Sequence, residues 1–267
     1  MFTDLQIAGQ SFRVFDHGNG MPILLVHGFP LDHTMWKHQL NHFGSRYRVI
    51  APDLRGFGGS TLDDDDESIS MESFADDLEG ILDNLSVTEP VIYCGLSMGG
   101  YIGWQFLQRY RSRVAAMILC DTRSAADAVE IARGRQMMAQ QVISNGVDEA
   151  AKTMIAKLFC QNSIDTQPEM INEVLSVMLR TDRRSVAAAQ RGMSMRPDMT
   201  DTLSAIDVPS LVICGTEDVI TPPDEMRAMA DQIPNSTFEL IPDAGHMAPL
   251  ENPVVFNSLV DRFLAQL

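Results

Sequence analysis

The sequence predicts an α/β fold, in which a mostly parallel sheet is flanked by helices and interrupted by a helical cap. Short β-rich runs alternate with segments of helical periodicity along most of the 267 residues, as in strands joined by right-handed helical crossovers. The run I-L-L-V at 23–26 is apolar at every position, which is typical of a strand that helices cover on both faces. Residues 123–202 contain helical stretches and no convincing strand. We therefore expect a core domain of residues 1–122 and 203–267, with residues 123–202 inserted as the cap.

The composition favours a protein that acts on small molecules. A hydrophobic content of 45% in 267 residues is enough for one large core. Acidic residues outnumber Lys plus Arg by 36 to 20, and the net charge of −16 disfavours binding to nucleic acid or to an anionic membrane. The sequence has no run of about 18 apolar residues and no basic segment followed by an apolar one at its start. We expect a soluble, cytoplasmic protein with no membrane partner.

The four cysteines form no pattern typical of a disulfide framework or of a metal site. Cys94, Cys120 and Cys214 each end an apolar β-like run, which suits small buried side chains, and Cys160 stands alone. This usage fits a reducing cytoplasm. The sequence contains no cofactor motif and no metal cluster, and we expect neither a cofactor nor a metal.

The first part of the chain is expected to form strands and one helix. Two β-rich runs over 12–16 and 22–27, separated by the turn signal H-G-N-G, predict an opening hairpin. A helix is expected over 33–43, because its large apolar residues recur at helical spacing. A strand over 47–51 follows.

The next segment is the glycine-rich loop P-D-L-R-G-F-G-G-S. It lacks the lysine of a Walker motif and lies in acidic surroundings, which argues against a phosphate site. We expect Asp53 and Arg55 to pair and brace it. The acidic run 63–67 is interpreted as a solvated loop. The other elements expected are helices over 71–85, 98–109, 125–144, 147–159, 169–179, 184–195, 223–232 and 253–267, and strands over 115–119, 210–214 and 237–241.

Most of the histidines are interpreted as structural. His27 lies in the turn H-G-F-P at the carboxyl end of a predicted strand, where open α/β sheets bind their ligands. We interpret its ring as space-filling, whereas the backbone amide of Phe29 could point at a ligand. His33, His38 and His42 are interpreted as solvated or edge residues, because no acidic or cysteine partner for a metal site is apparent near them.

The stretch P-V-I-Y-C-G-L-S-M-G-G-Y at 90–101 places a serine in a sharp turn between a strand and a helix. Gly95 and Gly99 lack a Cβ, so the backbone can turn tightly enough to push the Ser97 hydroxyl clear of both elements. The helix that begins near Met98 directs its unpaired N–H groups at any negative charge that forms there. Ser97 is therefore a candidate nucleophile.

A serine nucleophile needs a base and an acid that orients the base. His246, in the polar loop P-D-A-G-H-M-A-P-L-E-N-P after the last predicted strand, is placed to act as the base. Asp218, in C-G-T-E-D-V-I-T-P, follows a neighbouring predicted strand and is the favoured acid. Two rivals exist, since Asp121 also follows a strand and Glu217 adjoins Asp218.

Four ordered motifs make the chain similar to the α/β-hydrolases over nearly its full length. They are H-G-F-P, G-L-S-M-G-G, G-T-E-D and G-H-M-A-P-L-E. The resemblance implies the α/β-hydrolase fold, with Ser97 as nucleophile, His246 as base and Asp218 as the acid. It also implies an oxyanion hole made of the backbone N–H groups of Phe29 and Met98. Dehalogenases and epoxide hydrolases of this fold generally carry aspartate at the elbow, so Ser97 argues against both activities.

The expected reaction is hydrolysis of a small-molecule carboxylic ester or lactone through an acyl-enzyme. The short cap and the stretch L-C-D-T-R-S-A-A-D resemble those of carboxylesterases and of 3-oxoadipate enol-lactonase-like hydrolases. A dicarboxylic lactone would need a cation, for which Arg123 is the first hypothesis, ahead of Arg133 and Arg135. The alternatives are a C–C bond hydrolase or perhydrolase with the same triad and, less favoured because all three triad members are present, a non-catalytic binding protein. The sequence predicts no oligomeric state.

Overall fold

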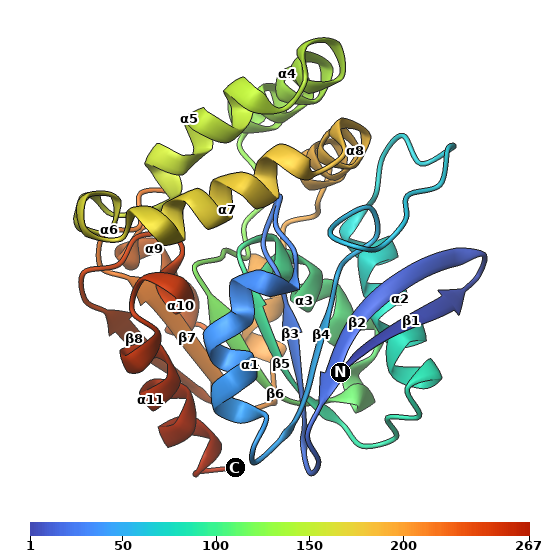
Figure 1. Cartoon of the computed structure of the whole chain (residues 1–267). Helices are drawn as coiled ribbons and strands as arrows, with labels where there is room; N and C mark the ends of the chain where they lie inside the picture. Colours follow the sequence, from blue (N-terminus) through green and yellow to red (C-terminus); the bar gives the residue numbers. More distant parts are fainter.

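An eight-stranded sheet forms the centre of the molecule in the computed structural model, which describes residues 1–267 (Figure 1). The strand order is β1-β2-β4-β3-β5-β6-β7-β8. All neighbours from β4 to β8 pair in parallel, whereas β2 pairs antiparallel with β1 and with β4. The strands are β1 (Phe2–Ile7), β2 (Gln10–His17), β3 (Pro22–Val26), β4 (Arg48–Pro52), β5 (Val91–Leu96), β6 (Val114–Cys120), β7 (Ser210–Gly215) and β8 (Ser236–Ile241). The prediction of a mostly parallel sheet is confirmed.

The predicted opening hairpin is wrong, because its two strands do not pair with each other. β2 and β3 follow each other along the chain, but β4 lies between them in the sheet. The chain opens instead with the antiparallel pair of β1 and β2. β1 is an edge strand with alternately exposed side chains, so its sequence carries no continuous apolar run. A turn signal shows where the chain reverses, but it does not show which strand becomes the neighbour.

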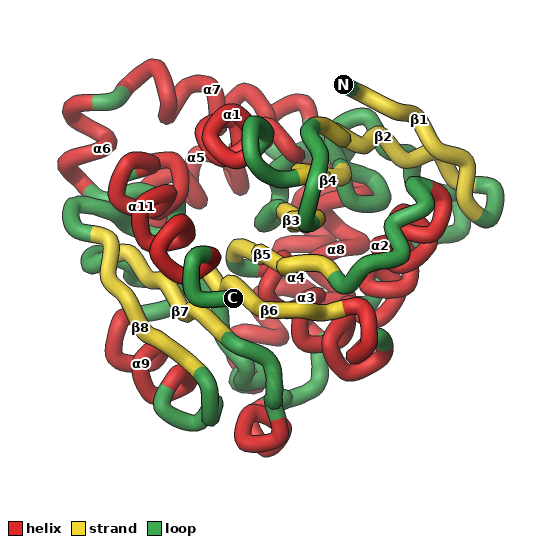
Figure 2. The backbone as a smooth tube through the Cα atoms, turned by 90° about the horizontal axis from the view of Figure 1, so that it is seen from below, coloured by secondary structure: helices red, strands yellow, loops and turns green.

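Helices cover both faces of the sheet, as Figure 2 shows in a view along the strand direction. On one face lie α1 (Lys37–Phe43) and α11 (Pro253–Leu264), and on the other lie α2 (Met71–Asn84), α3 (Met98–Arg109) and α9 (Pro223–Ala230). Each face has its own large cluster of buried apolar side chains. The helix predicted over 33–43 is a 3₁₀ turn followed by α1, and its aromatic residues are buried as expected. None of the helices combines the length and the apolar character that crossing a bilayer requires.

Five α-helices separate β6 from β7 in the sequence and lie beyond the carboxyl ends of the strands (Figure 1). They are α4 (Val129–Asn145), α5 (Asp148–Leu158), α6 (Gln161–Thr166), α7 (Pro168–Arg180) and α8 (Arg183–Ser194). Four of them match predicted helices within a few residues. The prediction missed α6, whose six residues are too few for a helical period to be visible. Short helices also occur at Arg111–Arg113, Thr200–Ala205 and, as α10, at Ala248–Glu251.

The predicted pair of Asp53 and Arg55 does not form. The Asp53 carboxylate accepts the backbone N–H groups of His33 and Gly59 at 2.9 and 2.8 Å. Arg55 reaches instead to Asp77 of α2, with its Nη2 2.5 Å from Oδ1. Both side chains therefore brace the loop, Asp53 through backbone N–H groups and Arg55 through a carboxylate that is distant in the sequence.

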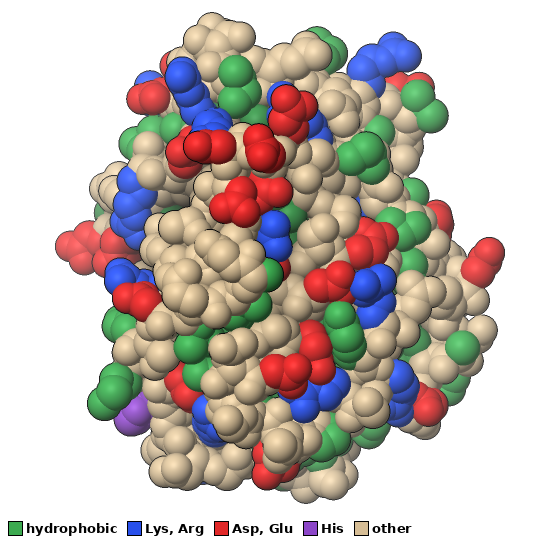
Figure 3. All heavy atoms as spheres, turned by 90° about the vertical axis from the view of Figure 1, so that its right-hand side faces the viewer, with side chains coloured by type: hydrophobic (Ala, Val, Ile, Leu, Met, Phe, Trp, Pro, Cys, Tyr) green, Lys and Arg blue, Asp and Glu red, His purple; other side chains and the backbone are tan.

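The acidic run 63–67 lies in a surface loop, as predicted, although parts of it are ion-paired. Arg184 of α8 pairs with Asp64 at 2.8 Å, and Arg55 pairs with Asp66 at 3.3 Å. On the face of the molecule drawn in Figure 3, acidic side chains are interspersed with lysines and arginines. The excess of negative charge is therefore partly neutralised locally by ion pairs.

Candidate active site

Ser97 lies in the sharp turn between β5 and α3. Its backbone is left-handed, with φ 54° and ψ −111°, a strained conformation for a residue other than glycine. The Ser97 N–H donates to the carbonyl of Cys120 at 2.9 Å, which ties the turn to the end of β6. The elbow needs glycine at two positions, because a Cβ on Gly95 would lie 2.4 Å from the carbonyl oxygen of Gly99, and one on Gly99 would lie 2.3 Å from that of Val26. The G-x-S-x-G pattern thus has the geometric basis that the sequence suggested.

The H-G-F-P turn packs against this elbow. A Cβ on Gly28 would lie 2.8 Å from Leu96 Cδ2 and 3.5 Å from Ser97 Cβ. The N–H of the next residue, Phe29, donates to no acceptor in the protein. Met98 is the first residue of α3, so its N–H has no acceptor within the helix. Neither of the two N–H groups predicted for an oxyanion hole is therefore used by a helix or a strand.

Asp218 and His246 form a buried hydrogen-bonded pair. Asp218 Oδ2 lies 2.8 Å from His246 Nδ1, and the two residues are 3% and 2% exposed. They belong to the loops after β7 and β8, and Ser97 follows β5, so all three lie at the carboxyl edge of the same parallel strands. The ring of His246 bonds to Asp218 and Thr221, and Ser97 Oγ is not among its hydrogen-bond partners.

The Asp218 carboxylate is held in its charged form by several donors. Its Oδ1 accepts the backbone N–H groups of Ile220 and Thr221 at 2.7 and 3.1 Å, and its Oδ2 accepts the Thr221 hydroxyl at 2.5 Å. Burial raises the pKa of Asp218, but the positive charge and hydrogen bond of His246 and the bonds from Thr221 outweigh it, so the pKa lies below its usual value. A charged carboxylate at this place keeps the proton of the imidazole on Nδ1 and leaves Nε2 as the acceptor.

Glu251 is a site residue that the sequence analysis did not assign, although it ends the motif G-H-M-A-P-L-E. Its Oε1 accepts the N–H groups of Gly245 and Met247, which flank His246, at 2.8 and 3.2 Å. Its Oε2 accepts the Cys160 N–H at 2.9 Å, which joins the segment between α5 and α6 to the histidine loop. A buried acid five residues after the histidine was the signal available in the sequence, but its backbone partners were not visible there.

Replacing Glu251 with alanine should leave the buried N–H groups of Gly245 and Cys160 without an acceptor, whereas the Met247 N–H keeps the Leu158 carbonyl. We expect the free energy of unfolding to fall by about 2 kcal/mol and kcat to fall by about tenfold, because the histidine loop loses its brace. Urea unfolding and ester hydrolysis measure the two effects. Glu217→Ala is the matched control, since that side chain is exposed and should matter little. Equal stability of the two variants would contradict the bracing role.

The two rival acids lie near Asp218 but make no hydrogen bond to His246. The Glu217 side chain is exposed, and neither Glu217 nor Asp121 bonds to His246. Asp121 is fully buried at the end of β6, where its Oδ1 accepts the Gly215 N–H at 2.8 Å. Among the carboxylates, His246 is hydrogen-bonded only to Asp218.

The other histidines hold the loops around the site. His27 is fully buried; its Nε2 accepts the Leu54 N–H at 3.0 Å and its Nδ1 bonds to the Gly28 carbonyl at 3.0 Å, as the structural interpretation predicts. Burial lowers its pKa and keeps the ring neutral. His33 and His42 do have acidic partners, contrary to the sequence analysis: His33 Nδ1 lies 2.6 Å from Asp53 and His42 Nε2 lies 2.7 Å from Asp261. Both pairs link segments that are distant in the sequence, which is why they were missed.

The arginines considered as carboxylate anchors are engaged or exposed. The guanidinium of Arg123 pairs with Glu225 of α9 through Nε at 3.0 Å and Nη2 at 3.1 Å, and it also donates to the Ile220 carbonyl. Arg135 pairs with the buried Asp127 at 2.6 Å, and Arg133 is exposed. The hypothesis of an Arg123 anchor is therefore not favoured by its contacts.

The Arg123→Ala variant should change the kinetics of anionic and neutral esters alike. Because the guanidinium already has a carboxylate partner, we expect KM for a half-ester of succinate and for the matching neutral diester to change by the same factor, within about threefold. A loss confined to the anionic ester would restore Arg123 as a substrate anchor.

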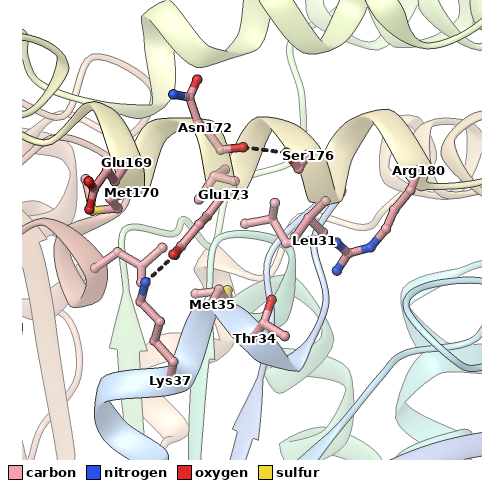
Figure 4. A pocket seen from close by; sticks show the side chains of 13 residues that line it. Leu31, Thr34, Met35, Lys37, Glu169, Met170, Asn172, Glu173, Ser176 and Arg180 are labelled. Atoms are coloured by element: carbon pink, nitrogen blue, oxygen red, sulfur yellow. Dashed lines mark hydrogen bonds and ion pairs between the residues drawn. The ribbon is translucent and has the colours of Figure 1, made fainter.

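A cavity of about 630 Å³ lies between α7 and the start of α1 (Figure 4). Leu31, Met35 and Val174 contribute to its apolar lining, and the ion pair of Lys37 and Glu173 crosses it. None of the predicted catalytic residues lines this cavity. It is therefore a groove between α7 and the segment 31–37, and its lining does not include the Asp218–His246 pair.

Comparison with known proteins places this geometry in a family. The model described as alpha/beta hydrolase fold matches residues 21–253. The AB hydrolase superfamily protein YisY of Bacillus subtilis is 32% identical over 260 residues, which cover 94% of both proteins. The 3-oxoadipate enol-lactonase 2 of Acinetobacter baylyi is 25% identical over 94% of this chain and 91% of its own length.

Solved structures agree with the sequence matches. A thermophilic esterase from Thermogutta terrifontis superposes with a TM-score of 0.95 at 41% identity, covering 100% of this chain and 98% of its own. The enol-lactonase from Burkholderia xenovorans has a TM-score of 0.91 at 25% identity, covering 98% of this chain and 100% of its own. On the family match, the fold and these relatives, the chain belongs to the α/β-hydrolase fold family and is an enzyme of that family.

Proposed function

We propose that this enzyme hydrolyses carboxylic esters or lactones of small molecules through an acyl-enzyme formed on Ser97. The observation that carries the proposal is the buried pair of His246 and Asp218 at the sheet edge where the strained Ser97 elbow also lies. The relatives support the substrate class, since they include proteins named as an esterase and as enol-lactonases.

In the proposed reaction, His246 Nε2 takes the proton of Ser97 as the hydroxyl oxygen attacks the substrate carbonyl. The tetrahedral intermediate collapses when the imidazolium gives this proton to the leaving alkoxide, which departs as an alcohol. Water then attacks the acyl group, again losing a proton to His246, and the carboxylic acid leaves as Ser97 regains its proton. Asp218 stays charged and stabilises the imidazolium in each half of the cycle.

The proposed oxyanion hole consists of the N–H groups of Phe29 and Met98. Both donors are unused by secondary structure, and the α3 amino terminus adds its positive dipole end. Such donors act on the oxygen that becomes negative in the transition state, so they favour acyl chemistry over simple binding. This is a further argument against a non-catalytic receptor.

We also propose that residues 123–202 act as a cap that shapes the substrate pocket. The segment contacts both functional loops, because the Met247 N–H donates to Leu158 of α5 at 3.1 Å and Thr181 Oγ1 donates to the Pro30 carbonyl at 3.2 Å. Those contacts lie next to His246 and to Phe29. A reducing cytoplasm is proposed as the location, in keeping with four free cysteines.

The test is a substrate panel on the natural enzyme. Short-chain p-nitrophenyl esters, aliphatic lactones, C–C substrates and acetate with hydrogen peroxide separate the esterase, lactonase, C–C hydrolase and perhydrolase activities. Mass spectrometry of acid-quenched enzyme should find the acyl group on the peptide that contains Ser97. Turnover of none of the esters and lactones, or an acyl adduct on another residue, would overturn the proposal.

A further inference from the structure

Asp121 is a buried carboxyl that the proposed mechanism does not use. It follows β6 with a left-handed backbone, φ 44°, and its side chain has no exposure to solvent. Oδ1 accepts the Gly215 N–H at 2.8 Å, but Oδ2 is buried without any hydrogen-bond donor. One oxygen of Asp121, one of Asp218 and the sulfur of Cys214 all lie within 4.8 Å of one another. A charged Asp121 would thus leave an unpaired oxygen against a second carboxylate.

The two carboxyls are unequally provided with donors. Asp218 accepts bonds from two backbone N–H groups, the Thr221 hydroxyl and His246, whereas Asp121 accepts one backbone N–H. When two acids share a buried site, the one with fewer donors keeps its proton. Beyond Asp218 and its partner His246, the ionisable groups near Asp121 are Cys120, Cys214 and Glu251, and none of these three supplies a positive charge.

We propose that Asp121 is a neutral carboxylic acid whose proton on Oδ2 is donated to Asp218, and that it thereby positions the triad acid. The proposal rests on the assignment of Asp218 as that acid. Asp121 is a positioning residue, because it acts through Asp218 and does not touch the substrate. The proton satisfies the unpaired oxygen of Asp121 and adds a further donor to Asp218, which helps to hold that carboxylate in place.

Electrostatics agree with this assignment. Burial and then the negative charge of Asp218 raise the pKa of Asp121 well above its usual value, and the bond from Gly215 opposes them only in part. An acid with a raised pKa in the folded state destabilises the fold as pH rises from its unfolded pKa toward its folded one. Asp121 therefore costs stability at neutral pH, which implies a functional reason for it.

Asparagine is the isostere of the neutral acid, so the variants Asp121→Asn and Asp121→Ala test the proposal. Asn keeps an acceptor for Gly215 and a donor for Asp218, whereas Ala removes both. We expect kcat to fall by about tenfold in Asp121→Ala and to be restored to within about threefold of the natural value in Asp121→Asn. The acid limb of the pH profile of kcat/KM should move to higher pH in Asp121→Ala, because Asp218 loses a donor and attracts the proton of His246 more strongly.

A charged Asp121 predicts the opposite sign. Removing a negative charge near His246 would move the acid limb to lower pH in both variants, and that result would overturn the proposal. A loss of about 10⁴ in Asp121→Asn, with Asp218→Asn still active, would show instead that Asp121 is the triad acid and would also remove the proposed role of Asp218. Failure of the proposed function as a whole is distinguishable, since the natural enzyme would then turn over no ester.

Two readouts do not depend on activity. Infrared difference spectra of the natural protein against Asp121→Asn should contain the C=O band of a protonated carboxylic acid at neutral pH, and its absence would overturn the proposal. At pH 7 to 8, the Tm of Asp121→Asn should be higher than that of the natural protein by about 3 °C or more. This difference should vanish toward about pH 4, because the carboxyl of the natural residue is then protonated in the unfolded chain too and takes up no proton on folding. A Tm difference that does not vary with pH would contradict a neutral Asp121.

Discussion

The Ser97→Ala variant should lose a factor of about 10⁴ or more in kcat toward p-nitrophenyl acetate. The loss is expected because alanine provides no hydroxyl for the proposed attack on the substrate carbonyl, so only positioning of the substrate near water remains. The fold should be unaffected, since serine and alanine both carry a Cβ and bear the same strain at φ 54°. Steady-state kinetics and thermal unfolding of the two proteins measure both statements.

Ser144→Ala is the matched control for this experiment. Ser144 is an exposed residue of α4 whose hydroxyl donates to the Gln140 carbonyl at 3.1 Å, and its removal should leave kcat unchanged. Activity of Ser97→Ala within tenfold of the natural enzyme, with a normal Tm, would mean that another residue is the nucleophile. The acyl-enzyme proposal would then fail while the family assignment would stand.

The parts of this fold that the sequence predicts best are those whose causes are local. The strand, glycine elbow and helix around Ser97 are specified by adjacent residues, so α3 was predicted with the bounds observed and a strand was predicted where β5 lies. The same holds for β7 with Asp218 and β8 with His246, where an apolar run ends in a polar loop. The carboxyl ends of parallel strands lie at one edge of the sheet, so the loops after β7 and β8 were expected to bring Asp218 and His246 close together.

The parts that the sequence did not predict depend on contacts between distant segments. The place of β4 between β2 and β3 is decided by sheet assembly, and the partners of Asp53 come from His33 and Gly59. Glu251 lies in a motif that the sequence analysis identified, but its role could not be inferred there. Its partners are backbone N–H groups of a loop whose shape only the folded chain defines. Motifs identify reactive side chains, but the residues that hold them in place are found only from the fold.

Replacing Asp218 with asparagine should lower kcat by about 10⁴. The amide can turn its NH₂ toward the ring, which then presents an acceptor at Nδ1 and a proton at Nε2, the wrong tautomer for taking a proton from Ser97. The hydrogen bonds from Ile220 and Thr221 hold the amide in the place of the carboxylate, so the substitution changes the chemistry with little change in geometry. KM should change by much less than kcat, because Asp218 does not touch the substrate.

The pH dependence of stability provides a second, independent check on Asp218. Its pKa is lowered in the folded state, so its charge contributes stability above the unfolded pKa, and that contribution is lost as pH falls through the lower folded pKa. Asp218→Asn lacks this contribution, and its deficit in Tm should be full at neutral pH and shrink below about pH 4. Glu217→Gln, one residue earlier and exposed, should match the natural enzyme in kcat and at every pH. Equal loss of activity in Asp218→Asn and Glu217→Gln would contradict the role of Asp218 as the orienting carboxylate. The loss would then reflect a disturbance of the loop that carries both residues.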